Sequence, residues 1–134
     1  MIRAVVDTNT LVSGLGWRGT PKVVIDAVLD GKIGLVTSQP LLDELARVLH
    51  YPKLAPMFPE PDRILLLIAT IAETVRPARR LSVVTDEPDN RVLEAAEAGE
   101  VDVIVTGDHE LRALEVFQGI DLLTPADALK RLED

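Results

Sequence analysis

The sequence predicts an α/β fold, a three-layer α/β/α sandwich with a mainly parallel central sheet. Short β-rich apolar runs alternate with stretches of helical spacing, which is typical of crossover connections between parallel strands. The runs at 2–6 and 101–105 are apolar almost throughout, as strands covered on both faces should be. A length of 134 residues with 47% apolar side chains suits one domain, residues 1–134, around a hydrophobic core.

Each expected strand is a short apolar run bounded by Gly, Asp, Ser or Thr, and these runs lie at residues 2–6, 33–36, 81–84, 101–105 and 122–123. Each expected helix has apolar residues at three- and four-residue intervals, and these stretches lie at residues 21–30, 39–50, 62–75, 89–98, 110–117 and 125–132. The segment 51–62 carries four prolines, which end the helix before it and favour an extended connection.

The helix expected at 62–75 is apolar nearly all round from Ile64 to Ile71. Such a helix is either fully buried or presents one face to a partner. A domain of this size has one layer of helices on each face of its sheet, so full burial is difficult. The pattern therefore favours a homodimer contact, and packing inside a single core is the alternative.

The charge balance excludes some classes of protein. With 14 basic and 22 acidic side chains, the net charge of −8 argues against simple nucleic-acid binding through a basic face, but not against an enzyme that meets phosphates through a metal ion.

The absence of cysteine excludes disulfides, zinc–thiolate sites and cysteine nucleophiles. The longest apolar stretch is too short to span a bilayer and the first residues lack signal-peptide features, so we expect a soluble cytoplasmic protein without a membrane partner.

Two aspartates are expected at the ends of strands. Asp7 directly follows the run 2–6, and Asp108 follows the run 101–105 after Thr106 and Gly107. In open α/β sheets ligands bind at the carboxyl ends of the strands, so both acids fall on the edge where chemistry is expected. A turn residue or a helix cap is the alternative explanation for either acid alone.

A glutamate is expected at the border of a buried helix face. At about 100° per residue, Glu44 lies beside the apolar stripe of the helix 39–50, whereas Asp43 points away from it. A carboxylate in that position is destabilising unless a cation or a donor meets it. A salt bridge from Glu44 to Arg47 is the alternative.

Asp89 repeats this pattern at the start of the helix 89–98, because it lies three residues before Val92 on the inward side. A favourable interaction with the helix dipole is its alternative explanation, and turn formation is that of Asp86. The charged residues Arg91, Glu94 and Glu97 are expected on the solvent side.

If the four acids Asp7, Glu44, Asp89 and Asp108 converge, each pair about 5 Å apart repels by about 3 kcal/mol at an effective dielectric constant near 20. Only a bound cation or protonation relieves this repulsion. Ligands that are all oxygen select Mg²⁺ or Mn²⁺ over zinc or copper. Such an ion, with several waters left in place, is suited to phosphodiester hydrolysis.

Four motifs, in order, carry a resemblance to a known family. They are Val5-Val6-Asp7-Thr8-Asn9, Leu42-Asp43-Glu44-Leu45, Asp86-Glu87-Pro88-Asp89-Asn90 and Val105-Thr106-Gly107-Asp108. Together they resemble PIN-domain proteins, in particular the bacterial and archaeal VapC-like branch regarded as toxins of toxin–antitoxin pairs. The resemblance covers nearly the whole chain. It implies a Rossmann-like α/β/α fold, a metal-dependent ribonuclease that uses Mg²⁺ or Mn²⁺, an RNA substrate and a cognate antitoxin.

The family's acidic quartet maps onto Asp7, Glu44, Asp89 and Asp108 as catalytic and metal-binding residues. Three supporting positions also match: two polar residues that orient the acids or a bound water, and one additional acid. These are Asn9, Thr106 and Asp86. The pair His109-Glu110 departs from the lysine and aspartate that relatives often carry. Candidates for phosphate contact are Arg47, Lys53, Arg63, Arg79 and Arg80.

Two other functions stay open. A phosphatase or phosphotransfer domain of similar topology would use a strand-end aspartate as its nucleophile, with a second acid two residues later or a lysine at a later strand end. Here Asn9 and Asp108 occupy those positions, which speaks against it. A catalytically inactive PIN-like module that binds RNA or protein would have lost one of the four acids, and none is missing.

Overall fold

The computed structural model describes residues 1–133; residue 134, the last of the predicted single domain, lies outside the described residues. Within residues 1–133 one sheet has six strands in the order β3-β2-β1-β4-β6-β5. Neighbouring strands are parallel, except that β5 runs antiparallel to β6. The strands are β1 (Ile2–Val6), β2 (Ile33–Ser38), β3 (Glu73–Val75), β4 (Val103–Val105), β5 (Val116–Phe117) and β6 (Ile120–Leu123).

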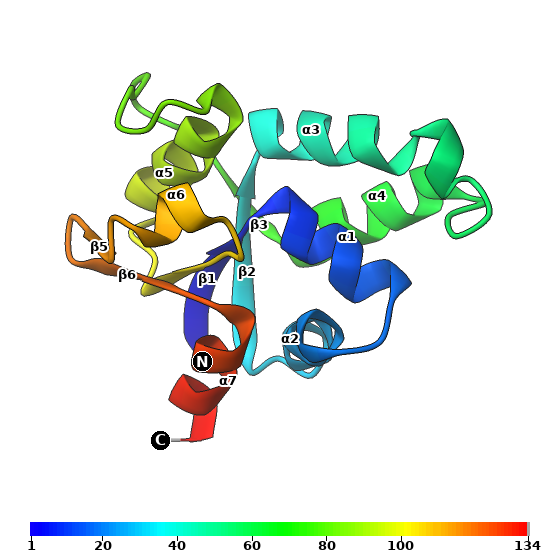
Figure 1. Ribbon diagram of the computed structural model, residues 1–134, viewed down its shortest axis with the longest axis horizontal. Coiled ribbons are helices and arrows are strands. Elements are labelled where there is room, and N and C mark those ends of the chain that lie inside the picture. The colour runs from blue at the N-terminus through cyan, green and yellow to red at the C-terminus, as the bar shows by residue number, and fades with distance from the viewer. Residues whose placement is uncertain (134) are drawn as a thin grey trace.

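Helices cover both faces of this sheet (Figure 1), which confirms the predicted three-layer sandwich. Side chains alternate along β1: Ala4 and Val6 belong to one hydrophobic cluster and Val5 to the other. The first cluster is covered by α1 (Thr8–Gly16), α2 (Thr20–Leu29), α3 (Gln39–Leu49), α4 (Pro61–Ile71) and α7 (Pro125–Glu133). The second cluster is covered by α5 (Glu87–Gly99) and α6 (His109–Arg112).

Helix α1 was not predicted. Its sequence contains Thr, Asn, Ser and two glycines, which are weak helix formers in isolation, so no apolar period marks it. The helix forms because the Asp7 side chain caps it, and because Gly14 allows α1 and α2 to approach closely. A Cβ at Gly14 would lie 2.5 Å from both Ile25 Cγ1 and the Pro21 carbonyl oxygen.

The strand predicted at 81–84 is wrong, since this segment pairs with no strand in the described chain. Its backbone N–H groups are satisfied by side chains of α5 instead. Glu94 accepts from Leu81, and Asn90 accepts from Val83 and Val84. Buried backbone donors need partners, and a side chain serves as well as a neighbouring strand.

The helix predicted at 62–75 ends earlier, at Ile71, and the residues Glu73–Val75 form the edge strand β3. These residues pair in parallel with Val36–Ser38 of β2, and Thr74 and Val75 are β-branched, which suits a strand. The apolar period could not reveal this change, because Val75 also fits the helical spacing.

The helix predicted at 110–117 is also wrong over most of its length. Helix α6 has only the four residues His109–Arg112, and a tight hairpin of β5 and β6 follows. The hairpin needs left-handed backbone at Gln118 and Gly119, with φ of 52° and 78°. Gly119 supplies that conformation without strain.

The proline-rich segment 51–62 is not simply extended, since it contains the short 3₁₀ helix η1 (Pro52–Leu54). Phe58, only 3% exposed, anchors the segment in the core. The Trp17 ring packs edge-on against Phe58 with their centroids 6.2 Å apart. This segment therefore packs against the end of α1.

Helix α4 is only partly covered. Ile68 is buried, whereas Leu66, Leu67 and Ile71 are 68%, 45% and 39% exposed. This agrees with the expectation that one layer of helices cannot bury an all-apolar helix. In the part of the chain that the structure describes, every helix is too short or too polar to cross a membrane.

Candidate active site

The candidate site lies where the strand order of the sheet reverses. Strand β1 has β2 on one side and β4 on the other, because the chain runs from β1 outward through β2 to β3 and then returns to β4 on the opposite side of β1. Asp7 follows β1 and Asp108 follows β4, at the carboxyl ends of two adjacent central strands. In open α/β sheets this switch point is where ligands bind.

The Thr106 hydroxyl joins these two aspartates. It is completely buried, donates a hydrogen bond to Asp7 Oδ2, and accepts one from the Asp108 N–H at 2.9 Å. Asp7 is itself buried, with 7% of its surface exposed. This hydroxyl therefore links the carboxylate of Asp7 to the backbone of Asp108.

Both aspartates also cap helices, as the alternative explanation expected. Asp7 Oδ1 accepts from the Thr10 N–H at 2.9 Å, and Asp108 Oδ1 accepts from the Leu111 N–H at 2.9 Å. Capping occupies one oxygen of each carboxylate and fixes its direction. It does not exclude a second function for the same side chain.

Helix α3 presents its two acids as predicted. Glu44 is half-buried, whereas Asp43 is exposed and accepts a hydrogen bond from Gln39 at 2.8 Å. Ser38 is the N-cap of this helix, and its hydroxyl accepts from the Leu41 N–H at 3.5 Å. The period of the apolar stripe was therefore enough to separate the two carboxylates.

Glu44 lies within electrostatic reach of the strand-end site. Burial raises the pKa of Glu44, and the charges of Asp7 and Asp86 raise it further. The Thr8 side chain and the Arg47 charge lower this pKa. The side chain is thus close enough to Asp7 to feel its charge.

Asp89 is partly buried near several other acids. Burial raises its pKa to about 7, together with the charges of Asp108, Asp86, Asp7 and Glu110. Its Oδ2 atom is buried and has no hydrogen-bond partner. A buried oxygen of this kind calls for a proton or a cation.

The carboxylate oxygens of these acids suit an open site for a hard divalent ion, and not a site in which protein ligands surround the ion. Within residues 1–133 no three His, Cys, Asp or Glu side chains stand ready to hold a metal ion together. Mg²⁺ is commonly bound through one or two carboxylates, with waters and substrate phosphates completing its shell. The unpartnered Asp89 Oδ2 fits that kind of site.

Two open clefts meet this group of acids. One, of about 440 Å³, is lined by Asp7, Asn9 and Asp108, and the exposed Asn9 lies on its wall. The other, of about 390 Å³, is lined by Glu44, by a second glutamate and by three arginines from α3, α5 and the loop before α5. The acids therefore reach solvent on two sides.

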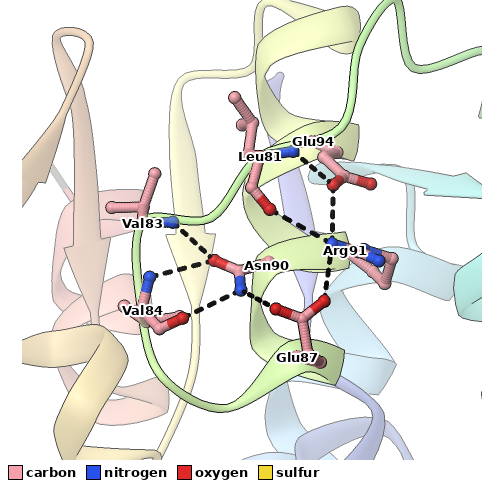
Figure 2. Close-up of polar contacts among 7 residues, drawn as sticks. All are labelled: Leu81, Val83, Val84, Glu87, Asn90, Arg91 and Glu94. Atoms are coloured by element: carbon pink, nitrogen blue, oxygen red, sulfur yellow. Dashed lines mark hydrogen bonds and ion pairs between the residues drawn. The ribbon is translucent and has the colours of Figure 1, made fainter.

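The segment 81–86 is held in place by Asn90, which is completely buried (Figure 2). Asn90 Oδ1 accepts from the N–H groups of Val83 and Val84 at 2.9 and 3.0 Å, and its Nδ2 donates to the Val84 carbonyl at 2.9 Å. This fixes the loop that carries Asp86 to the helical turn that carries Asp89. Asp86 is the N-cap residue of α5, but its side chain accepts no capping hydrogen bond.

The predicted solvent exposure of Arg91 and Glu94 is wrong. Both are buried and form an ion pair of 2.8 Å, and Glu94 accepts from the Leu81 N–H at 2.8 Å while Arg91 donates to the Leu81 carbonyl at 3.2 Å (Figure 2). The segment before α5 crosses this helix face and covers it. The sequence did carry one signal of this burial: Arg91 and Glu94 have opposite charges, stand three residues apart and lie among small and apolar residues.

Glu110 is a further residue that sequence reasoning missed. Its Oε1 atom accepts a hydrogen bond from the Thr85 N–H at 2.6 Å, which ties the loop before α5 to α6. The loop with Asp86 is thereby held next to Asp108. The available signal was its position two residues after Asp108.

A family model for the PIN domain matches residues 3–110. The chain therefore belongs to the PIN domain family, whose members are generally nucleases that use divalent metal ions. The family resemblance found in the sequence is confirmed.

The chain is similar to several known proteins at low sequence identity. An uncharacterized protein of Methanocaldococcus jannaschii is 30% identical over 117 residues, which cover 84% of this chain and 75% of that protein. PAE2754 of Pyrobaculum aerophilum has a TM-score of 0.65 at 18% identity, covering 98% of this chain and 90% of that one. VapBC2 of Rickettsia felis, bound to a DNA fragment from its promoter, has a TM-score of 0.61 at 12% identity, with coverages of 90% and 97%. FitAcB of Neisseria gonorrhoeae has a TM-score of 0.59 at 14% identity, covering 92% of this chain and 98% of that one.

Proposed function

We propose that residues 1–134 act as one nuclease domain that cleaves RNA internally with the help of Mg²⁺ or Mn²⁺. The observation that supports this most is the buried, unpartnered Asp89 Oδ2 within the field of Asp7, Asp86 and Asp108. Such an oxygen is satisfied by a divalent cation at neutral pH. The family, whose members are generally nucleases, supports a nucleic-acid substrate, and the resemblance to the VapC-like branch is our reason for proposing RNA.

In this proposal Asp7, Glu44, Asp89 and Asp108 hold the ion. When bound, the ion supplies an activated water and neutralises charge on the phosphate. Thr106 keeps Asp7 and Asp108 in a fixed relation, because its hydroxyl bonds to both residues.

Two further side chains assist the site in this proposal. Asn9 lines the same cleft as Asp7 and Asp108, where its amide can donate to a water or to a phosphate oxygen. Asp86 is not used as a cap and raises the pKa of both Glu44 and Asp89. It therefore adds negative charge where a cation would bind.

The direct test is cleavage of defined RNAs with Mg²⁺, with Mn²⁺ and with EDTA. We expect cleavage with either metal, none in EDTA, and none for Asp7→Asn or Asp108→Asn. The control variant Asp43→Ala should cleave at the wild-type rate, because Asp43 points away from the site on the same helix as Glu44.

Three results would contradict the proposal. Cleavage that survives EDTA removes the need for the ion. RNA binding without cleavage supports an inactive binding module, and hydrolysis of a phosphate monoester with no action on RNA supports a phosphatase or phosphotransfer domain.

We also propose that the chain is the toxin of a toxin–antitoxin pair. Its motifs resemble the VapC-like branch, and VapBC2, which was crystallised on a fragment of its promoter, includes a chain of the same fold. Expression in a bacterial host should arrest growth, and Asp108→Asn should restore it. Rescue by the product of an adjacent short reading frame would identify the antitoxin, and normal growth under wild-type expression would contradict the proposal.

A homodimer through α4 completes the proposed assembly. Leu66, Leu67 and Ile71 lie on this helix and are exposed to solvent. Three large apolar side chains on one helix are destabilising in water, and a second copy of the same helix would cover them.

A further inference from the structure

The cleft beside Glu44 is lined by three arginines and by a second glutamate, Glu87, although the chain carries a net charge of −8. Arg47 on α3, Arg80 in the loop before α5 and Arg91 on α5 all line this cleft, which measures about 390 Å³. A concentration of arginines beside a group of carboxylates needs an explanation. Arginine is the residue best suited to phosphate recognition, because its planar fork donates two parallel hydrogen bonds.

Two of these arginines are free. Arg91 is bound to Glu94 at 2.8 Å and to Glu87 at 3.5 Å, so it forms part of the cleft wall (Figure 2). Within residues 1–133, neither Arg47 nor Arg80 takes part in an ion pair, and both are exposed. Their donors are therefore available to a ligand.

The backbone next to Arg80 is fixed. Leu81 donates its N–H to Glu94 at 2.8 Å and accepts from Arg91 at 3.2 Å, as Figure 2 shows. The buried ion pair thus holds the adjoining residue, Arg80, at the edge of the cleft. Because the backbone beside Arg80 is already held, less backbone freedom is lost when this residue binds a ligand.

The other candidates for phosphate contact differ from these two. Arg63 pairs with Glu60 at 3.3 Å, and Arg79 pairs with Glu97 at 2.7 Å. Lys53 lies on η1, and it does not line this cleft. Charge alone did not separate the five candidates in the sequence, but the cleft and the ion pairs do.

We infer that Arg47 and Arg80 bind a backbone phosphate of the RNA strand, next to the phosphate that is hydrolysed. The inference rests on the proposed function and deepens it. Glu44 lies in the same cleft, so a phosphate held by the two arginines is adjacent to the acids of the candidate site. The two cations also offset the repulsion that an anionic strand meets from those acids.

The test measures binding and cleavage of one fluorescein-labelled single-stranded RNA by the full chain. Arg47→Ala and Arg80→Ala should each weaken binding roughly tenfold and raise KM by a similar factor, with a smaller change in kcat. The slope of log affinity against log salt should fall by about 0.7 for each arginine removed. Arg47→Lys should recover part of the affinity, since it keeps the charge.

Arg79→Ala and Arg63→Ala are the matched controls, because each removes one exposed arginine outside the cleft. Their affinity and salt slope should equal those of the wild type. Equal behaviour of Arg47→Ala, Arg80→Ala and these controls would overturn the inference. A second result would also overturn it. If Arg47→Ala and Arg80→Ala lose binding to a polyglutamate probe but bind RNA as the wild type does, the cleft binds an acidic protein partner.

The two proposals fail differently. If the wild type binds RNA through Arg47 and Arg80 but cleaves none with Mg²⁺ or Mn²⁺, the nuclease proposal is wrong and the phosphate subsite stands. If the wild type cleaves RNA and both arginine variants match the controls, the nuclease proposal stands and the subsite is wrong.

Discussion

The Thr106 hydroxyl has two partners, and it serves them with one atom that both donates and accepts. It donates to Asp7 and accepts from the backbone of Asp108, in a position with no exposure to solvent. Valine has nearly the same shape and neither hydrogen bond. A single methyl-for-hydroxyl exchange therefore separates the orienting role of Thr106 from its packing.

We expect Thr106→Val to destabilise the protein by about 1–3 kcal/mol, because it leaves a buried carboxylate oxygen without its donor. RNA cleavage should fall much further than stability, since both strand-end acids lose their common partner. Thr106→Ser, which keeps the hydroxyl, is the control for both effects. Chemical denaturation and single-turnover cleavage measure them, and wild-type activity for Thr106→Val would rule out the orienting role.

Asp89 makes the stability of the metal-free protein depend on pH. Its pKa is 3.8 in ordinary surroundings and about 7 in the folded chain. Between these values the folded state holds a proton that the unfolded state has released, so the free energy of unfolding falls as pH rises from about 4 to about 7. The ionised form then bears the repulsion of the neighbouring acids.

Asp89→Asn should remove this loss of stability with rising pH. In EDTA, the variant should unfold at a higher temperature than the wild type at pH 8 and at nearly the same temperature at pH 4. Thermal unfolding followed by circular dichroism across this range measures the difference. A constant gap between the two proteins at all pH values would show that Asp89 does not titrate in this window.

At the scale of elements, periodicity predicted a residue's face where regular helices and strands cover the helix. The exposure of Asp43 and the half-burial of Glu44 follow from the stripe of α3, whose neighbours are regular elements. Arg91 and Glu94 are buried because an irregular segment crosses α5. A loop held by side-chain hydrogen bonds leaves no period in the sequence.

Glu94 is therefore expected to be a stability residue. Glu94→Ala leaves the buried Arg91 without its partner and the Leu81 N–H without its acceptor, which should cost about 3–5 kcal/mol. Glu60→Ala breaks an exposed ion pair of the same spacing and should have no measurable effect. Urea denaturation compares the two, and equal midpoints would contradict the structural role of the buried pair.

At the scale of the whole molecule, the exposed face of α4 predicts self-association. Leu66→Asp or Leu67→Asp should shift the mass measured by light scattering from dimer to monomer, because each places a charge in the contact. Val116→Asp, at a residue 54% exposed on β5, is the control and should leave the mass unchanged. A wild type that is monomeric at high concentration would dispose of the dimer.

Much of the molecule could be predicted because it depends on strands buried on both faces. The runs that became β1 and β4 are continuous and apolar, so the edge with Asp7 and Asp108 followed from them. The strands β3 and β5 are short and mostly exposed, and their residues also fit a helical period, whereas the strand predicted at 122–123 lies in β6. The cleft beside Glu44 was not predicted, because the three arginines that line it are distant in sequence and the net charge of the chain is negative.

The central claim is that acids from four separate elements form one site for a divalent ion, and Mn²⁺ binding measured by titration calorimetry at pH 8 tests it most directly. We predict that the wild type binds Mn²⁺, that Asp89→Asn weakens binding at least tenfold, and that Asp43→Asn leaves it unchanged. Absence of binding to the wild type, or equal affinities for the wild type and Asp89→Asn, would contradict the claim.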